Sequence, residues 1–123
     1  MSRVCFQLQV DPTRLDEYRA RHAAVWPDML EAIAASGRRN YSLFLRDDGL
    51  LIGYYETDDV AASQASLAAS PVTARWEAEM APFFVALPGD SGRPDQAAPE
   101  LSEIFNLDDQ LLSASAAAAD PEN

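Results

Sequence analysis

The stretch YSLFLRDDGLLIGYYE, residues 41–56, decides the fold because it predicts two strands joined by a tight turn. Tyr41 to Leu45 and Leu50 to Glu56 are rich in aromatic and aliphatic residues, and the RDDG between them is typical of a hairpin turn. A helical pattern lies on each side of this hairpin, and a further strand pattern lies beyond each helical pattern. The expected order is therefore β-α-β-β-α-β.

The chain before the hairpin predicts a strand and a helix. From Val4 to Val10 apolar residues alternate with more polar ones, which is typical of a half-buried strand. From Leu15 to Ile33 apolar residues recur every three or four positions, which predicts one buried face of a helix. Pro27 should bend this helix or break it in two, because proline lacks a backbone donor and crowds the preceding turn.

The chain after the hairpin repeats the plan. Ala61 to Ala69 has a helical pattern, and Ser70-Pro71 is typical of the start of a second helix. A turn-rich loop at Leu87 to Pro99 leads to Glu100 to Asp108, which predicts a fourth strand. The inner face of the second helix is expected to carry Val72, Trp76 and Met80.

These elements predict an α+β fold, a ferredoxin-like antiparallel sheet with both helical segments on one face. The other face of the sheet would then be uncovered. A second copy of the chain is the simplest way to cover it, so we expect a homodimer. We expect residues 1–108 to form this single domain. Residues 109–123 are acidic and rich in alanine, and we expect a disordered tail or a frayed helix.

Composition narrows the function classes. The 123 residues include 9 basic and 20 acidic side chains, for a net charge of -11. Such a surface repels phosphates, so we expect neither nucleic acid nor an anionic membrane as a partner. No stretch has the apolar length of a membrane span or the pattern of a secretory leader, so we expect a cytoplasmic protein.

The only histidine of the chain lies in an aromatic row. Tyr18, His22 and Trp26 are spaced four residues apart, so they share one helix face. The row is either core packing or the wall of a pocket. Aromatic side chains around one group that titrates near neutral pH suit a sugar substrate and proton transfer. One histidine and one cysteine do not build a conventional zinc site, so we expect no metal.

Six runs of the sequence together resemble the L-rhamnose mutarotase family, from Arg3 to about Asp108. They are FQLQV, EYRARHAAVWPDM, GRRNYSLFL, YYE, SPVTARWEAEM and ELSEIFNLD. The resemblance implies a dimeric α+β barrel, an isomerase that interconverts the α and β anomers of L-rhamnose without a cofactor. It also gives roles to particular side chains: His22 as proton donor, and Tyr18, Tyr41 and Trp76 as sugar contacts.

One position departs from the family pattern, in which two adjacent tryptophans often lie on the second helix. Here the pair is Trp76-Glu77, and we expect Glu77 to contact substrate at the rim of the pocket. The expected sugar is therefore L-rhamnose or a related 6-deoxy or L-sugar. The general base is open between Glu77 and Glu56, and Trp26 is either a sugar contact or core. The alternative functions are a dimeric α+β barrel monooxygenase and a non-catalytic barrel that binds a small ligand.

Overall fold

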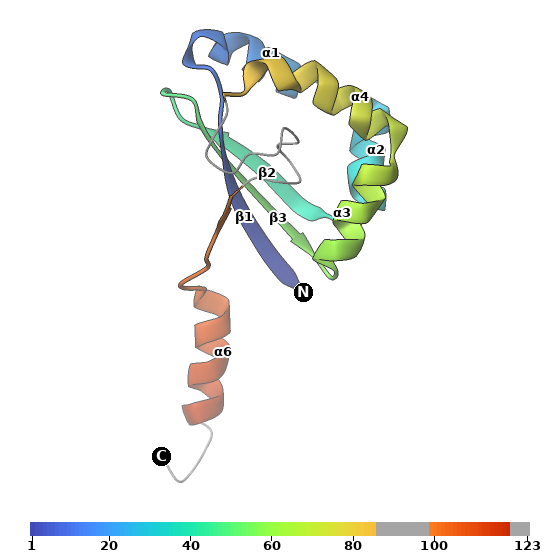
Figure 1. Ribbon diagram of the computed structural model, residues 1–123. Coiled ribbons are helices and arrows are strands. Elements are labelled where there is room, and N and C mark those ends of the chain that lie inside the picture. Colours follow the sequence, from blue (N-terminus) through green and yellow to red (C-terminus); the bar gives the residue numbers. More distant parts are fainter. Residues whose placement is uncertain (86–98, 119–123) are drawn as a thin grey trace.

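The computed structural model describes residues 1–85 and 99–118, and it confirms the expected element order (Figure 1). Four strands form one antiparallel sheet in the order β2-β3-β1-β4. The strands are β1 (Ser2–Gln9), β2 (Arg39–Leu45), β3 (Leu50–Thr57) and β4 (Glu100–Leu101). The helices are α1 (Leu15–Ala23), α2 (Pro27–Ala35), α3 (Val60–Ala69), α4 (Pro71–Met80) and α6 (Leu107–Ala118), with short 3-10 turns η1 (Pro12–Arg14) and η2 (Ala81–Phe83).

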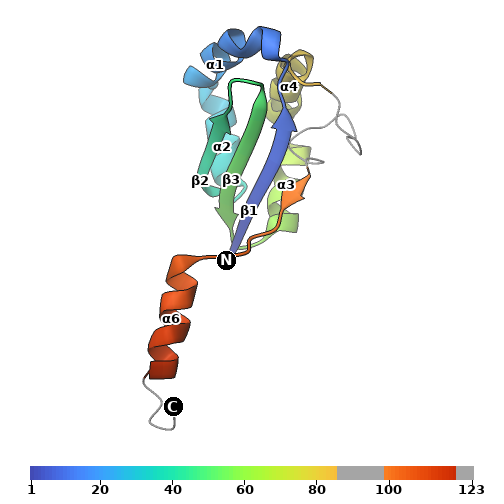
Figure 2. The same ribbon diagram turned by 90° about the vertical axis from the view of Figure 1, so that its left-hand side faces the viewer.

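The core lies between the sheet and α1 to α4, which all cover the same face (Figure 2). Alternate residues of β1, from Val4 to Leu8, are buried, as is Val10 just after the strand, while the residues between them are partly exposed. The strand β3 shows the same alternation, with Leu51 and Tyr55 on the buried side. The half-buried strands predicted from the sequence are therefore confirmed.

Pro27 breaks the first helical segment rather than bending it. The helix α1 ends at Ala23, and α2 begins at Pro27, the position where its missing N–H costs nothing. Non-helical backbone at Trp26 lets the chain change direction between the two helices. As a result α1 crosses one end of the sheet while α2 runs beside α3 and α4 (Figure 1).

In the described part of the chain, no helix covers the second face of the sheet (Figure 2). Phe44 on β2 is 62% exposed there, and Cys5 and Tyr54 are partly exposed on the neighbouring strands. The expected placement of the helices on a single face is thus confirmed.

The C-terminal strand is shorter than predicted. Only Glu100 and Leu101 pair with β1, whereas the prediction extended the strand to Asp108. Residues 102–106 form no regular element, and α6 then projects from the domain (Figure 1). The apolar side chains of Ile104 and Phe105 suggested a strand, yet both are exposed and pair with no strand among the described residues. Of the loop predicted at Leu87 to Pro99, residues 87–98 lie outside the described residues.

Candidate active site

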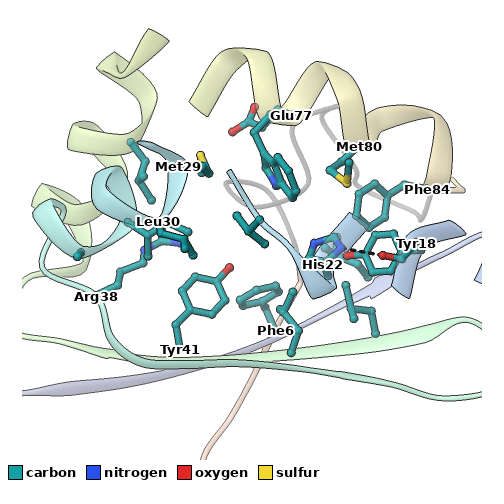
Figure 3. Close-up of a pocket in the computed structure, with 18 residues that line it drawn as sticks. Phe6, Tyr18, His22, Met29, Leu30, Arg38, Tyr41, Glu77, Met80 and Phe84 are labelled. Carbon is teal, nitrogen blue, oxygen red and sulfur yellow. Dashed lines mark hydrogen bonds between the residues drawn. The ribbon is translucent and has the colours of Figure 1, made fainter. Parts of the chain in front are cut away.

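A pocket of about 450 Å³ opens between the sheet and the helices (Figure 3). This volume lies within the range of roughly 300–1,000 Å³ that is usual for small-molecule sites. The wall is mostly apolar, and it includes every residue that the sequence assigned to catalysis or substrate binding. These residues are Tyr18, His22, Tyr41, Trp76 and Glu77.

The imidazole of His22 is held in one orientation. Its Nδ1 lies 3.1 Å from the backbone carbonyl oxygen of Tyr18, one helical turn earlier. The ring stacks on the Tyr18 ring at a centroid distance of 4.2 Å and meets the Trp76 ring edge-on at 5.4 Å. Because a carbonyl oxygen only accepts, Nδ1 carries the proton, and in the neutral ring Nε2 is left as the acceptor.

Burial also sets the charge state of His22. The apolar surroundings lower the pKa of the imidazole below its ordinary value, and the bond to the Tyr18 carbonyl opposes this only in part. The neutral imidazole is therefore the dominant form at neutral pH. A neutral ring with a free Nε2 is suited to accept a proton from a bound hydroxyl group.

The two tryptophans play different parts. Trp76 lines the pocket, and Trp26 does not. The Trp26 ring instead packs edge-on against the Trp76 ring at 5.0 Å, beside the buried side chain of Met29. Of the two roles left open by the sequence for Trp26, the structure supports core packing behind the pocket wall.

Tyr41 lines the pocket from β2, next to a β-bulge. Arg39 pairs with Glu56 and Ser42 with Tyr54, so Asn40 and Tyr41 together face one residue of β3. Asn40 adopts φ 50, a left-handed conformation that asparagine tolerates better than most residues. The Tyr41 ring then stacks against Tyr55 at 5.4 Å, and Figure 3 shows its hydroxyl directed away from the sheet.

The same bulge brings a residue that the sequence analysis missed into the pocket wall. Arg38 and Tyr41 are three positions apart, which in a regular strand places side chains on opposite faces. The extra residue in the bulge reverses that alternation, and both side chains line the pocket. No signal in the sequence marks Arg38, because the bulge depends on the backbone conformation of Asn40.

The two candidate bases are on different sides of the sheet. Glu77 lines the pocket from α4 (Figure 3). Glu56 lies on the helix-free face, where its carboxylate accepts hydrogen bonds from the Tyr54 hydroxyl at 2.7 Å and from the Asn40 amide at 3.4 Å. These hydrogen bonds, that of Tyr54 first, lower the pKa of Glu56. Glu56 is therefore remote from the pocket of its own chain.

The described residues contain no cluster of three or more His, Cys, Asp or Glu side chains that could hold a metal ion. Across these same stretches, none of the helices is long and apolar enough to cross a membrane.

The sequence matches a family model described as L-rhamnose mutarotase over residues 3–107. An L-rhamnose mutarotase of Listeria monocytogenes serotype 4b (strain F2365) is 35% identical over 108 residues, which cover 87% of this chain and 99% of that protein. An L-rhamnose mutarotase of Burkholderia orbicola (strain MC0-3) is 34% identical over 108 residues, which cover 88% of this chain and 100% of that protein.

Two solved structures share the fold. The L-rhamnose mutarotase from Formosa agariphila superimposes with a TM-score of 0.68 at 20% identity, covering 87% of this chain and 99% of that one. Tetracenomycin F2 cyclase from Streptomyces glaucescens, a type-II polyketide cyclase, gives 0.61 at 20% identity, covering 86% and 98%. At this identity the likeness concerns the fold alone, whereas the family match rests on the sequence. The chain belongs to the L-rhamnose mutarotase family.

Proposed function

We propose that this protein is an isomerase that interconverts the α and β anomers of L-rhamnose or of a related 6-deoxy or L-sugar. The observation that carries the proposal is the position of His22 in the wall of an aromatic pocket, where its Nδ1 contacts the Tyr18 carbonyl oxygen. Membership of the family favours this activity over a monooxygenase or a non-catalytic binding barrel.

Mutarotation opens a cyclic hemiacetal and closes it again on the other face of the carbonyl group. In ring opening, Nε2 of neutral His22 takes the proton of the anomeric hydroxyl as the C1–O1 double bond forms. The bond between C1 and the ring oxygen breaks, and that oxygen keeps the electron pair and gains a proton from water. In ring closure the hydroxyl formed from the ring oxygen attacks C1 and gives its proton to the hydroxide left by that water, while the His22 imidazolium returns its proton to O1 and so acts as the proton donor.

The remaining predicted site residues orient the sugar. The aromatic ring of Trp76 can cover an apolar face of the pyranose, and the Tyr41 hydroxyl can exchange hydrogen bonds with its hydroxyl groups. The phenol ring of Tyr18 is 3% exposed and holds His22 from behind. Glu77 adds carboxylate oxygens to the wall, which favours a substrate with hydroxyl groups on that side.

The direct test is the rate of exchange between the two anomeric proton signals of the sugar, measured by NMR saturation transfer. We expect the protein to accelerate exchange for L-rhamnose well above the spontaneous rate, without added metal or cofactor. L-fucose and L-lyxose, run beside it, measure the effect of Glu77 on the choice of sugar. No acceleration with any of the three sugars would contradict the proposed activity.

A homodimer is the second part of the proposal. Phe44 on the helix-free face and Ile104, Phe105 and Leu112 near the C-terminus expose more than half of their surface. Such an extent of apolar surface is typical of an interface between copies of a chain. Light scattering at micromolar concentration is expected to give the mass of two chains, and Phe44→Glu is expected to shift it toward one. A wild-type mass of one chain would contradict the dimer.

A cytoplasmic location stays a prediction, as does the division into a domain at residues 1–108 and a tail at 109–123.

A further inference from the structure

Arg38 is a buried cation in the pocket wall. The residue is only 5% exposed, yet it is among those that line the cavity. Its Nη2 atom is buried and has no hydrogen-bond partner within the described residues. A buried donor of a charged group that lacks an acceptor is costly, so such a group in a binding pocket points to an acceptor supplied by the ligand.

The guanidinium of Arg38 is held firmly on its other sides. Its Nε donates to the Ser63 hydroxyl at 2.8 Å, and that hydroxyl lies 3.4 Å from the hydroxyl of Ser36. The guanidinium carbon stacks over the Tyr55 ring at 4.1 Å from its centroid. These contacts fix the plane of the guanidinium before any ligand arrives, and they leave Nη2 without an acceptor in the described part of the chain.

Arg38 differs in this respect from the other described arginines, each of which forms an ion pair with a carboxylate. Those arginines are Arg3, Arg14, Arg19, Arg21, Arg39, Arg46 and Arg75. They are more exposed, where an ion pair contributes little. Within the described residues the buried arginine is thus the one without a carboxylate partner.

We propose that Nη2 of Arg38 binds a hydroxyl oxygen of the sugar on the side of the ring away from the anomeric carbon. In Figure 3, Arg38 and His22 lie on opposite sides of Tyr41. Since His22 acts at the anomeric carbon in the proposed function, on which this inference rests, Arg38 faces the far side of the pyranose. A sugar that lacks the matching hydroxyl leaves the buried donor unpaired and is rejected, so Arg38 determines specificity.

The test compares Arg38→Met with Arg39→Met, a matched control in which the adjacent arginine is exposed and pairs with Asp58. The exchange rate is measured against the concentration of the sugar that wild type prefers. Arg38→Met is expected to raise KM about 10- to 100-fold, the loss usual for a hydrogen bond to a charged group, with a smaller effect on kcat. Arg39→Met is expected to leave both constants unchanged.

A second measurement uses analogues of that sugar that each lack one hydroxyl. If Arg38 had only a structural role, its replacement would not weaken the binding of one particular analogue less than that of the others. One analogue is expected to bind wild type as weakly as the parent sugar binds Arg38→Met, with no further loss in the variant. If Arg38→Met does not fold, Arg38→Lys is used instead, because lysine keeps the positive charge but lacks the planar guanidinium with its several N–H donors. An unchanged KM, or equal losses on every analogue, would overturn the inference.

Calorimetric titration with the same sugars separates this inference from the proposed activity. Weaker binding to Arg38→Met than to Arg39→Met supports the role of Arg38 even if wild type fails to accelerate exchange. Equal binding to both variants refutes it, whatever the exchange rates.

Discussion

Replacement of His22 by asparagine is expected to lower the catalysed exchange of anomers by ~10²-fold or more, the usual effect of removing a positioned acid or base. The asparagine amide can still donate a hydrogen bond toward the Tyr18 carbonyl, which Nδ1 of His22 contacts at 3.1 Å. It has no group that titrates, so it cannot carry the proton between ring opening and ring closure. The loss is therefore expected in kcat, with a folded protein.

The control for this substitution is Tyr18→Phe, which keeps the ring that stacks on His22 at 4.2 Å and removes only the hydroxyl. Because Tyr18 also lines the pocket, where its hydroxyl is a predicted sugar contact, Tyr18→Phe is expected to weaken sugar binding more than it slows exchange. Circular dichroism and light scattering establish that both variants fold as wild type does. If folded His22→Asn retained full exchange on the preferred sugar, the imidazole would be structural, and Glu77 would become the first candidate for the acid or base.

The helices and strands that could be predicted are those in which apolar residues recur at a regular spacing, because that spacing shows which face of the element is buried. Alternation along β1 and spacings of three and four along α1 and α4 placed Tyr18, His22 and Trp76 on buried faces. Side chains on the buried faces of these elements also line a cavity between them. The residues of the pocket wall could therefore be predicted from the same spacing of apolar residues. Pro27 likewise marked the boundary between α1 and α2, although bending and breaking were equally open from the sequence.

The rest of the site depends on contacts between distant segments. Arg38 joins the pocket only because the bulge at Asn40 shifts the alternation of β2 by one residue. The face of Glu56 follows from the register of β3, which is fixed by pairing with β1. Phe6 lines the pocket where its ring lies against Gly53, at which a Cβ atom would come within 2.1 Å of the ring. An isolated glycine within a strand marks such a close approach but does not name the partner.

The pH dependence of exchange is expected to report the charge state of His22. Because burial lowers the pKa of the imidazole below its ordinary value of 6.5, the neutral form dominates at neutral pH. The rate, corrected for spontaneous exchange, is expected to be highest where the imidazole is neutral and to fall as the pH drops through the lowered pKa, by about tenfold per pH unit once the imidazolium dominates.

The same shift links pH to stability. The unfolded chain binds a proton at His22 at a higher pH than the folded chain does, so the contribution of this group to stability is complete above 6.5 and is lost as the pH falls toward the lowered pKa. His22 is the only histidine, so NMR titration of its ring protons measures the pKa without ambiguity. That pKa is expected to match the midpoint of the rate profile. A rate that instead rises as the imidazole becomes protonated would make the imidazolium the working form, and His22 would then begin the reaction as an acid at the ring oxygen.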